Sequence, residues 1–183
     1  MKQTALLLSL LALMLTCYSF APSLAQEPPK LSEEQLADIR RGELPEASLP
    51  CAPAECEWWE QLRKVTRKVR SGGDPTRLTE LIAQAKEKSY SIPVPDFGPS
   101  FLRRFEPQYS QIARANRISG NIGLDVELRA DGFVGEVTPK NSLGYGLDEN
   151  SVEAAGHIVF VPAVKDRQFV TVTKRVEMTF NIY

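Results

Sequence analysis

A strict alternation of apolar and polar residues late in the chain is the strongest constraint on its fold. Within Asn121–Arg129 every second residue is apolar: Ile122, Leu124, Val126 and Leu128. A period of two is typical of a strand with one face buried and the other in water. Asp131-Gly132 follows as a hairpin-turn signal, so Phe133–Thr138 is expected to return as a second strand.

The alternation returns at the C-terminus. A further strand is expected over Gln168–Tyr183, with Lys174 as a polar break in an apolar face made of Val170, Val172, Val176, Met178, Phe180 and Ile182. A helix from Leu147 to about Gly156 should separate this strand from the β-hairpin formed by the first two strands. The resulting order of helix, strand, strand, helix and strand predicts an α+β sandwich with a three-stranded, mainly antiparallel sheet packed with helices.

A helical hairpin is predicted ahead of this domain. The first helix has apolar residues at spacings of three and four, and Ser71-Gly72-Gly73 ends it; these residues are Trp58, Leu62, Val65 and Val69. Asp74-Pro75 then begins a second helix, with a capping carboxylate before a proline. Two such helices bury too little surface alone, so we expect them to pack on the C-terminal domain or on a partner. Because Trp58 and Trp59 are adjacent, one of them is expected to be half exposed.

The remaining segments divide by composition. Lys2, the apolar run Ala5–Thr16 and the small residues of Ser23-Leu24-Ala25 predict a cleaved secretory signal. A retained membrane anchor and a lipid on Cys17 are the alternatives. The expected organisation is a signal peptide or anchor (1–25), a flexible segment (26–54), the helical hairpin (55–90), a Pro-rich linker (91–105) and the C-terminal domain (106–183). Within the flexible segment, Ser32 and Gln35 predict one capped short helix.

Composition and charge restrict the function. The 183 residues carry 22 Lys and Arg against 23 Asp and Glu, and this balance argues against bulk electrostatic binding of nucleic acid. Cleavage would leave two cysteines, Cys51 and Cys56, for which a disulfide is favoured over free thiols or a metal site. The single histidine, His157, has no serine or thiol placed to complete a catalytic site. We therefore expect a non-enzymatic protein without cofactor or metal.

The first helix of the hairpin also carries a cluster of basic residues: Arg63, Lys64, Arg67, Lys68 and Arg70. We favour a solvated helix face as their role. The alternative is a surface that binds an anionic polymer, such as a membrane or the cell wall.

Five motifs follow one another between residues 106 and 163: Glu106–Arg114, Ile118–Leu124, Asp131–Val134, Gly144–Glu149 and Phe160–Ala163. Together they resemble the C-terminal domain of TonB, the energy transducer of Gram-negative bacteria. Ser110 and Ile158 depart from the pattern, since the family usually has a proline and an aromatic residue there. A shorter Pro-bearing segment and the helical hairpin stand where the family has a long Pro-rich spacer.

This resemblance implies β-augmentation, in which an extended segment of another protein pairs with the last strand. In the family that segment is the TonB box, near the N-terminus of an outer-membrane transporter, and the pairing serves energy-dependent transmembrane transport. Carried over to this chain, the edge is Phe169–Phe180 with Gln108 and Tyr109 alongside. The implied partner-binding residues are Gln108, Tyr109, Phe169, Val170, Thr171, Val172, Thr173, Lys174, Arg175, Val176, Glu177 and Met178.

The same resemblance implies a place in the periplasm and outer-membrane TonB-dependent transporters as partners. Inner-membrane motor proteins are further expected partners if residues 1–25 are retained as a membrane anchor. An exported soluble adaptor without force transduction is the alternative. The edge could also be blunted by its charges, or pair in a homodimer.

Overall fold

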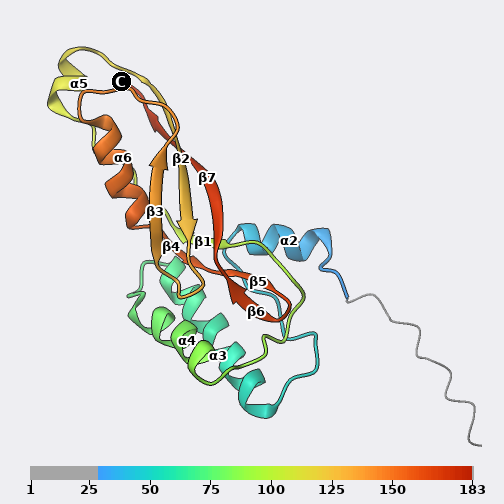
Figure 1. Ribbon diagram of the computed structural model, residues 1–183. Coiled ribbons are helices and arrows are strands. Elements are labelled where there is room, and N and C mark those ends of the chain that lie inside the picture. The colour runs from blue at the N-terminus through green and yellow to red at the C-terminus, as the bar shows by residue number, and fades with distance from the viewer. Residues whose placement is uncertain (1–28, 183) are drawn as a thin grey trace, which may run out of the picture.

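The computed structural model describes residues 29–182 (Figure 1). The predicted signal peptide, with its alternatives as an anchor or a lipidated segment, lies outside the described residues. The helices are α2 (Glu33–Arg40), α3 (Pro53–Arg70), α4 (Thr76–Glu87), α5 (Gln111–Ala115) and α6 (Leu147–Gly156). The strands are β1 (Ser100–Arg103), β2 (Gly120–Leu128), β3 (Val134–Pro139), β4 (Val159–Val161), β5 (Ala163–Lys165), β6 (Gln168–Val170) and β7 (Val172–Phe180).

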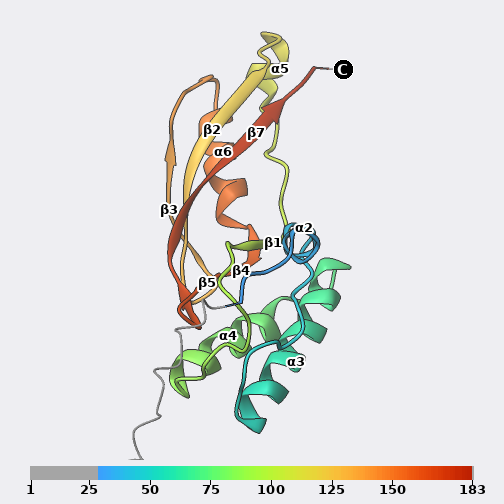
Figure 2. The same cartoon turned by 90° about the vertical axis from the view of Figure 1, so that its right-hand side faces the viewer.

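The C-terminal part is the predicted α+β sandwich. An antiparallel three-stranded sheet has the order β3-β2-β7, and α6 covers one of its faces (Figure 2). The core between them contains the alternating apolar residues of β2 and β7 and small residues of α6: Ile122, Leu124, Val126, Leu128, Val176, Met178, Phe180, Ala154 and Ala155. The prediction of one buried and one solvent-facing side is confirmed.

The predicted helical hairpin, α3 and α4, forms the base of the molecule. Helix α3 ends at Arg70, before the two glycines. The Asp74 carboxylate accepts a 3.0 Å hydrogen bond from the N–H of Thr76, the first residue of α4. Pro75, predicted as the first helical residue, occupies the N-cap position instead. None of the helices between residues 29 and 182 is long and apolar enough to cross a membrane.

The expectation for the paired tryptophans is wrong, because both are buried. Trp58 and Trp59 expose 3% and 0% of their surface. The indole N–H of Trp58 donates to the carbonyl of Leu81 on α4 at 2.9 Å, whereas that of Trp59 donates to the carbonyl of Pro45 at 3.0 Å. Each indole N–H thus has its own backbone acceptor, and the chain before α3 supplies the acceptor for Trp59.

The chain before α3 is packed rather than poorly ordered. Ser32 and Gln35 form the predicted capping box at the start of α2. Ile39 and Leu44 then enter the core of the helical hairpin. Both side chains are buried in the same apolar cluster as Trp59, and this burial stabilises the packed position of a segment that is otherwise polar.

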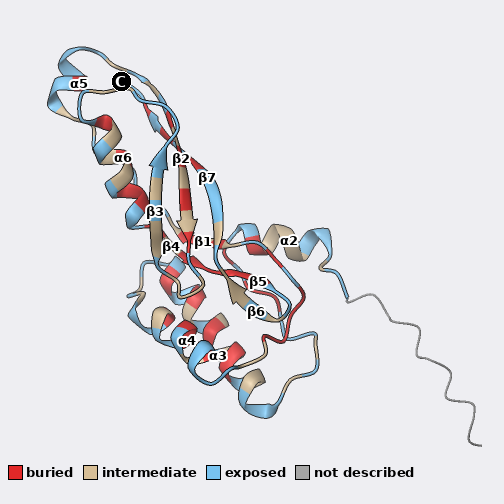
Figure 3. Cartoon of the chain, viewed as in Figure 1, coloured by how far each residue is buried: buried red, intermediate tan, exposed pale blue. Residues whose placement is uncertain are grey.

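The Pro-rich stretch before the sandwich also contributes to the core. Ile92, Val94 and Phe97 are buried among the helices of the base, and β1 pairs with β4 in an antiparallel two-stranded sheet. Prolines prevent helix in this stretch but leave the apolar side chains between them free to pack. Val161 and Val164, from the sandwich part of the sequence, lie in the same core, so the base and the sandwich are joined by shared packing. Figure 3 marks the buried residues of both parts in red.

A disulfide joins Cys51 and Cys56 at the start of α3, as predicted, with the two Cα atoms 5.7 Å apart. Next to it, the guanidinium group of Arg167 donates to the carbonyls of Pro50 at 2.6 Å and Ile92 at 3.2 Å. The turn between β5 and β6 is thereby fastened to two segments of the base.

Candidate functional site

The last strand, β7, is an edge of the three-stranded sheet. All nine of its residues pair with β2, in a regular antiparallel register from Gly120 opposite Phe180 to Leu128 opposite Val172. Among residues 29–182 no strand pairs with the other side of β7 (Figure 1). The open edge that the sequence led us to expect is present.

The backbone directions in β2 determine which residues of β7 face that open edge. Gly123 faces β3, because its carbonyl accepts from the N–H of Lys140 and its own N–H donates to the Asn141 side chain, both at 2.8 Å. Ala130, an odd number of residues further along, faces the opposite side and donates to Thr171 Oγ1. Since backbone groups alternate along a strand, the even-numbered residues of β2 bond to β7.

The partners of those residues are the even-numbered members of β7, so their backbone groups are occupied by β2. The odd-numbered members direct their N–H and C=O groups outward: Thr173, Arg175, Glu177 and Thr179. We call these four residues the open-edge set. All four side chains are exposed on the solvent face of the sheet, while Val176, Met178 and Phe180 point into the core.

On the solvent face, ion pairs connect β2 with β7 and with Lys140, the residue that follows β3. Asp125 on β2 receives Lys140 Nζ at 2.8 Å and Arg175 Nε at 3.2 Å. The hydrogen bond from Lys140, followed by that from Arg175, keeps the pKa of the Asp125 carboxyl below its usual value. Arg175 is therefore positioned from within the sheet while its remaining donors stay available at the edge.

Two of the predicted partner-binding residues lie elsewhere. Phe169 and Val170 belong to β6, which pairs with β5. The Phe169 ring also packs edge-on against Trp58, with centroids 6.2 Å apart. Phe169 thus packs the sandwich against the base, and the open edge starts only after Thr171.

Gln108 and Tyr109 are engaged at the far end of β7. The carbonyl of Gln108 accepts from the Asn150 side chain of α6 at 2.7 Å, and the hydroxyl of Tyr109 donates to the carbonyl of Ile118. The Tyr109 ring stands edge-on to Phe180, with centroids 5.7 Å apart. Tyr109 thus packs against the end of β7 from its core side, whereas Gln108 contacts α6. Thr179 lies within the predicted edge Phe169–Phe180, although it was not named among the partner-binding residues.

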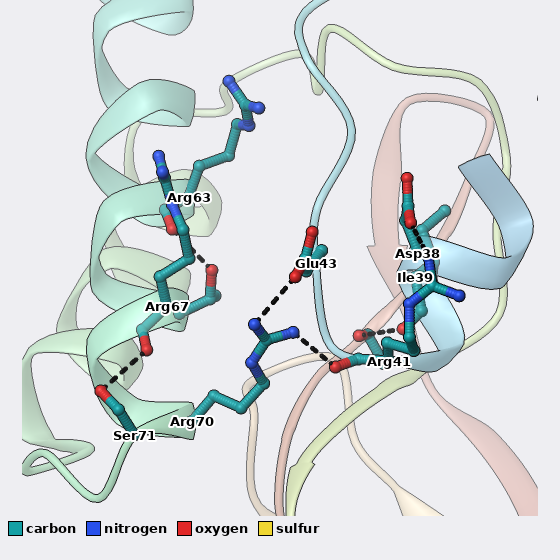
Figure 4. A network of polar contacts seen from close by, with 10 residues as sticks. Asp38, Ile39, Arg41, Glu43, Arg63, Arg67, Arg70 and Ser71 are labelled. Atoms are coloured by element: carbon teal, nitrogen blue, oxygen red, sulfur yellow. Dashed lines mark hydrogen bonds and ion pairs between the residues drawn. The ribbon is translucent and has the colours of Figure 1, made fainter. Parts of the chain in front are cut away.

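The basic cluster on α3 is partly occupied by structural contacts. Arg70 donates to the Glu43 carboxylate at 2.8 Å and to the carbonyl of Arg41 at 2.7 Å (Figure 4). Arg63 donates to the carbonyl of Leu44 at 3.1 Å and to Glu60 at 2.6 Å. These two arginines clamp the chain before α3 onto the helix, which leaves Lys64, Arg67 and Lys68 as the exposed remainder.

His157, the only histidine, is exposed at the end of α6 and stands edge-on to Phe105 at 6.0 Å. In the part of the chain that the structure describes, no group of three or more His, Cys, Asp or Glu side chains is arranged to hold a metal ion.

Comparison with known proteins agrees with this geometry. Residues 106–182 match the family model described as Gram-negative bacterial TonB protein C-terminal. This is a non-enzymatic, transport-associated family, whose members interact with outer-membrane transporters from the periplasm or from a membrane anchor. No curated protein matches the chain significantly. Residues 106–182 of this chain belong to the TonB C-terminal domain family.

Proposed function

We propose that this protein acts in the periplasm and binds extended segments of outer-membrane TonB-dependent transporters by strand addition at β7. The open edge supports this proposal most directly, because four successive outward-facing residues offer unpaired backbone N–H and C=O groups to an incoming chain. Family membership supplies the transporter class, and the edge supplies the mode of binding.

The side chains of the open-edge set suit reversible pairing. Thr173 and Thr179 are neutral and polar, and Arg175 and Glu177 carry opposite charges. Isolated edges with such residues resist indiscriminate aggregation. Binding would then depend on main-chain hydrogen bonds, with the side chains selecting register.

Whether the protein transmits force is a separate proposal that depends on residues 1–25. If they are retained as an anchor, the protein would act as a short-spacer transducer with inner-membrane motor partners. If they are removed, it would act as an exported soluble adaptor. Intact mass and cell fraction of the native protein distinguish the two: a chain that begins at Gln26 in the soluble periplasmic fraction supports the adaptor.

The exposed lysines and arginine of α3 support a second, weaker candidate, binding to an anionic surface. Lys64, Arg67 and Lys68 are free of the clamp that engages Arg63 and Arg70. Salt-sensitive binding to anionic vesicles that is lost in the double variant Arg67→Glu/Lys68→Glu would favour this function.

The strand-addition proposal is tested by a proline that removes one edge-facing donor. In Glu177→Pro the lost N–H points outward, so the fold should persist while a transporter N-terminal peptide binds about 2- to 12-fold more weakly, the cost of one hydrogen bond. Glu177→Gln is the matched control, because it removes the charge and keeps the donor. Titration calorimetry measures both affinities.

A neighbouring proline tests the assigned backbone directions. Val176→Pro removes a bond to β2 and should destabilise the fold itself. Equal peptide affinity for folded Glu177→Pro and Glu177→Gln would refute binding at this edge.

A further inference from the structure

A groove lined mainly by apolar side chains lies between α2 and the segments that join the base to the sandwich. Its volume is about 850 Å³, within the range of about 300–1,000 Å³ that is usual for small-molecule sites. We call it the α2 groove. None of its lining residues belongs to the open-edge set on β7. Its apolar surface combines half-buried and buried side chains: Leu31, Leu36, Leu49, Val94 and Pro95.

Hydrogen bonds hold the walls of the α2 groove in place. The N–H of Leu49 donates to the carbonyl of Pro93 at 3.0 Å. The Asp96 carboxylate accepts from the N–H of Asp166 at 2.9 Å, and Arg167 fastens the same turn to the base. A site that is already formed loses little conformational entropy when it binds a ligand.

The turn at the rim of the groove has an unfavourable backbone conformation. Asp166 and Arg167, between β5 and β6, have φ angles of +51° and +62°. This left-handed region favours glycine, and residues with side chains persist there only where their surroundings enforce it. The contacts of Asp96 and Arg167 supply that constraint, and the turn thereby presents its two charged residues to the groove.

Acidic groups predominate around the apolar surface. Three acids, Glu33, Asp96 and Asp166, line the groove together with two bases, Lys30 and Arg167. The Arg167 guanidinium is directed to backbone carbonyls of the base. Among residues 29–182, the carboxylates of Glu33 and Asp166 have no hydrogen bond or ion pair. These two groups are therefore available to a cation.

We propose that the α2 groove binds a small amphipathic cation, a ligand with an apolar body and one ammonium or guanidinium group. The apolar body would cover the three leucines, and its removal from water would supply most of the affinity. The cationic group would pair with Glu33 and Asp166 at the rim, which selects against anions of the same shape. This site is separate from the edge of β7 and does not depend on the proposed function.

Two probes with the same chain length and opposite charge test this site. Decylammonium and decanoate are titrated into the purified native protein by calorimetry, at concentrations at which neither forms micelles. Decylammonium should bind at a single site. Decanoate should bind about tenfold or more weakly, because like-charge contacts replace the two ion pairs at the rim.

Charge variants test the position of the cationic group. Glu33→Gln/Asp166→Asn should weaken decylammonium binding about 2- to 30-fold, the cost of two exposed ion pairs. Asparagine tolerates the left-handed conformation of the turn, so the fold should persist. Glu34→Gln/Glu57→Gln is the matched control, because it removes the same charge from exposed positions outside the groove.

An apolar variant tests the position of the ligand body. Leu49→Ser should weaken decylammonium binding about fivefold or more, since part of the apolar contact is lost. Ile112→Ser, at an exposed position on α5, is the control and should leave the affinity unchanged. Thermal unfolding checks that each variant is folded. If Leu49→Ser fails to fold, Leu36→Ala takes its place.

Three results would overturn the inference. The first is that decylammonium does not bind, or binds no more tightly than decanoate. The second is an unchanged affinity in the folded groove variants, which would place the probe elsewhere. The third is an affinity that falls as the protein concentration rises, which would show that a second copy occupies the groove. Glu177→Pro should leave decylammonium binding unchanged, because β7 lies outside the groove.

Discussion

Replacing Trp58 tests whether the base and the sandwich unfold together. Its ring is 3% exposed and lies at 5.9 Å from Trp59, 5.7 Å from Tyr90 and 6.2 Å from Phe169, measured between ring centroids. Phe169 leads directly into β7, so Trp58 connects the helical hairpin with the sheet. Trp58→Ala should lower the free energy of unfolding by about 3–5 kcal/mol, since it removes a buried aromatic ring and leaves a cavity.

For a chain of this length, such a loss corresponds to a fall in Tm of about 6–20 °C. Far-UV circular dichroism follows the helices and sheet, and the fluorescence of Trp59 follows the base; the two should give one coincident transition. Tyr90→Leu, which removes only one of the three ring partners, is the control and should cost less. A loss below about 1 kcal/mol, or a separate transition of the sheet at its original temperature, would refute the coupling.

Two further predictions concern stability. Gly132 has φ +84° and a Cβ there would lie 2.9 Å from Ile82 Cδ1 on α4, whereas Gly72 has φ +100° with nothing within 4 Å. Gly132→Ala should therefore destabilise the protein by about 1 kcal/mol more than Gly72→Ala, as measured by thermal or urea unfolding. Equal losses of stability would show that the turn between β2 and β3 does not pack closely against α4. The folded-state pKa of Asp125 is lowered, so its ionised carboxylate stabilises the folded protein. This stabilisation is fully present above the ordinary pKa of 3.8 and is lost as the pH falls through the lower folded value. Asp125→Asn should reduce the fall in Tm at acid pH. An unchanged slope of Tm against pH would contradict this contribution of Asp125 to stability.

Local patterns in the sequence predicted most of the sandwich. The alternation in Asn121–Arg129 and again after Gln168 identified two of the three strands of the sheet and their buried faces. Capping residues and glycines located the helix ends near Arg70 and Gly156. These features depend on residues only a few positions apart, so they can be recognised in the sequence alone.

The features that were missed depend on residues far apart in sequence. Strand β1 is only four residues long, and its pairing partner β4 follows well over fifty residues later. Burial of Trp59 requires the carbonyl of Pro45, and the clamp on α3 requires Glu43 to meet Arg70. Phe169 likewise looked like part of the edge because nothing local shows that Trp58 holds it. No period within a single segment could reveal these contacts.

The orientation of β7 has a mechanical consequence. The strand runs lengthwise from the base toward the end that carries α5 (Figure 1). Hydrogen bonds in an antiparallel ladder lie perpendicular to the strands. A partner strand on the open edge that is pulled along this axis would load all of those bonds in shear at once, whereas a sideways pull would open them one after another. The edge is thus oriented to resist tension along the long axis of the molecule with its full set of bonds.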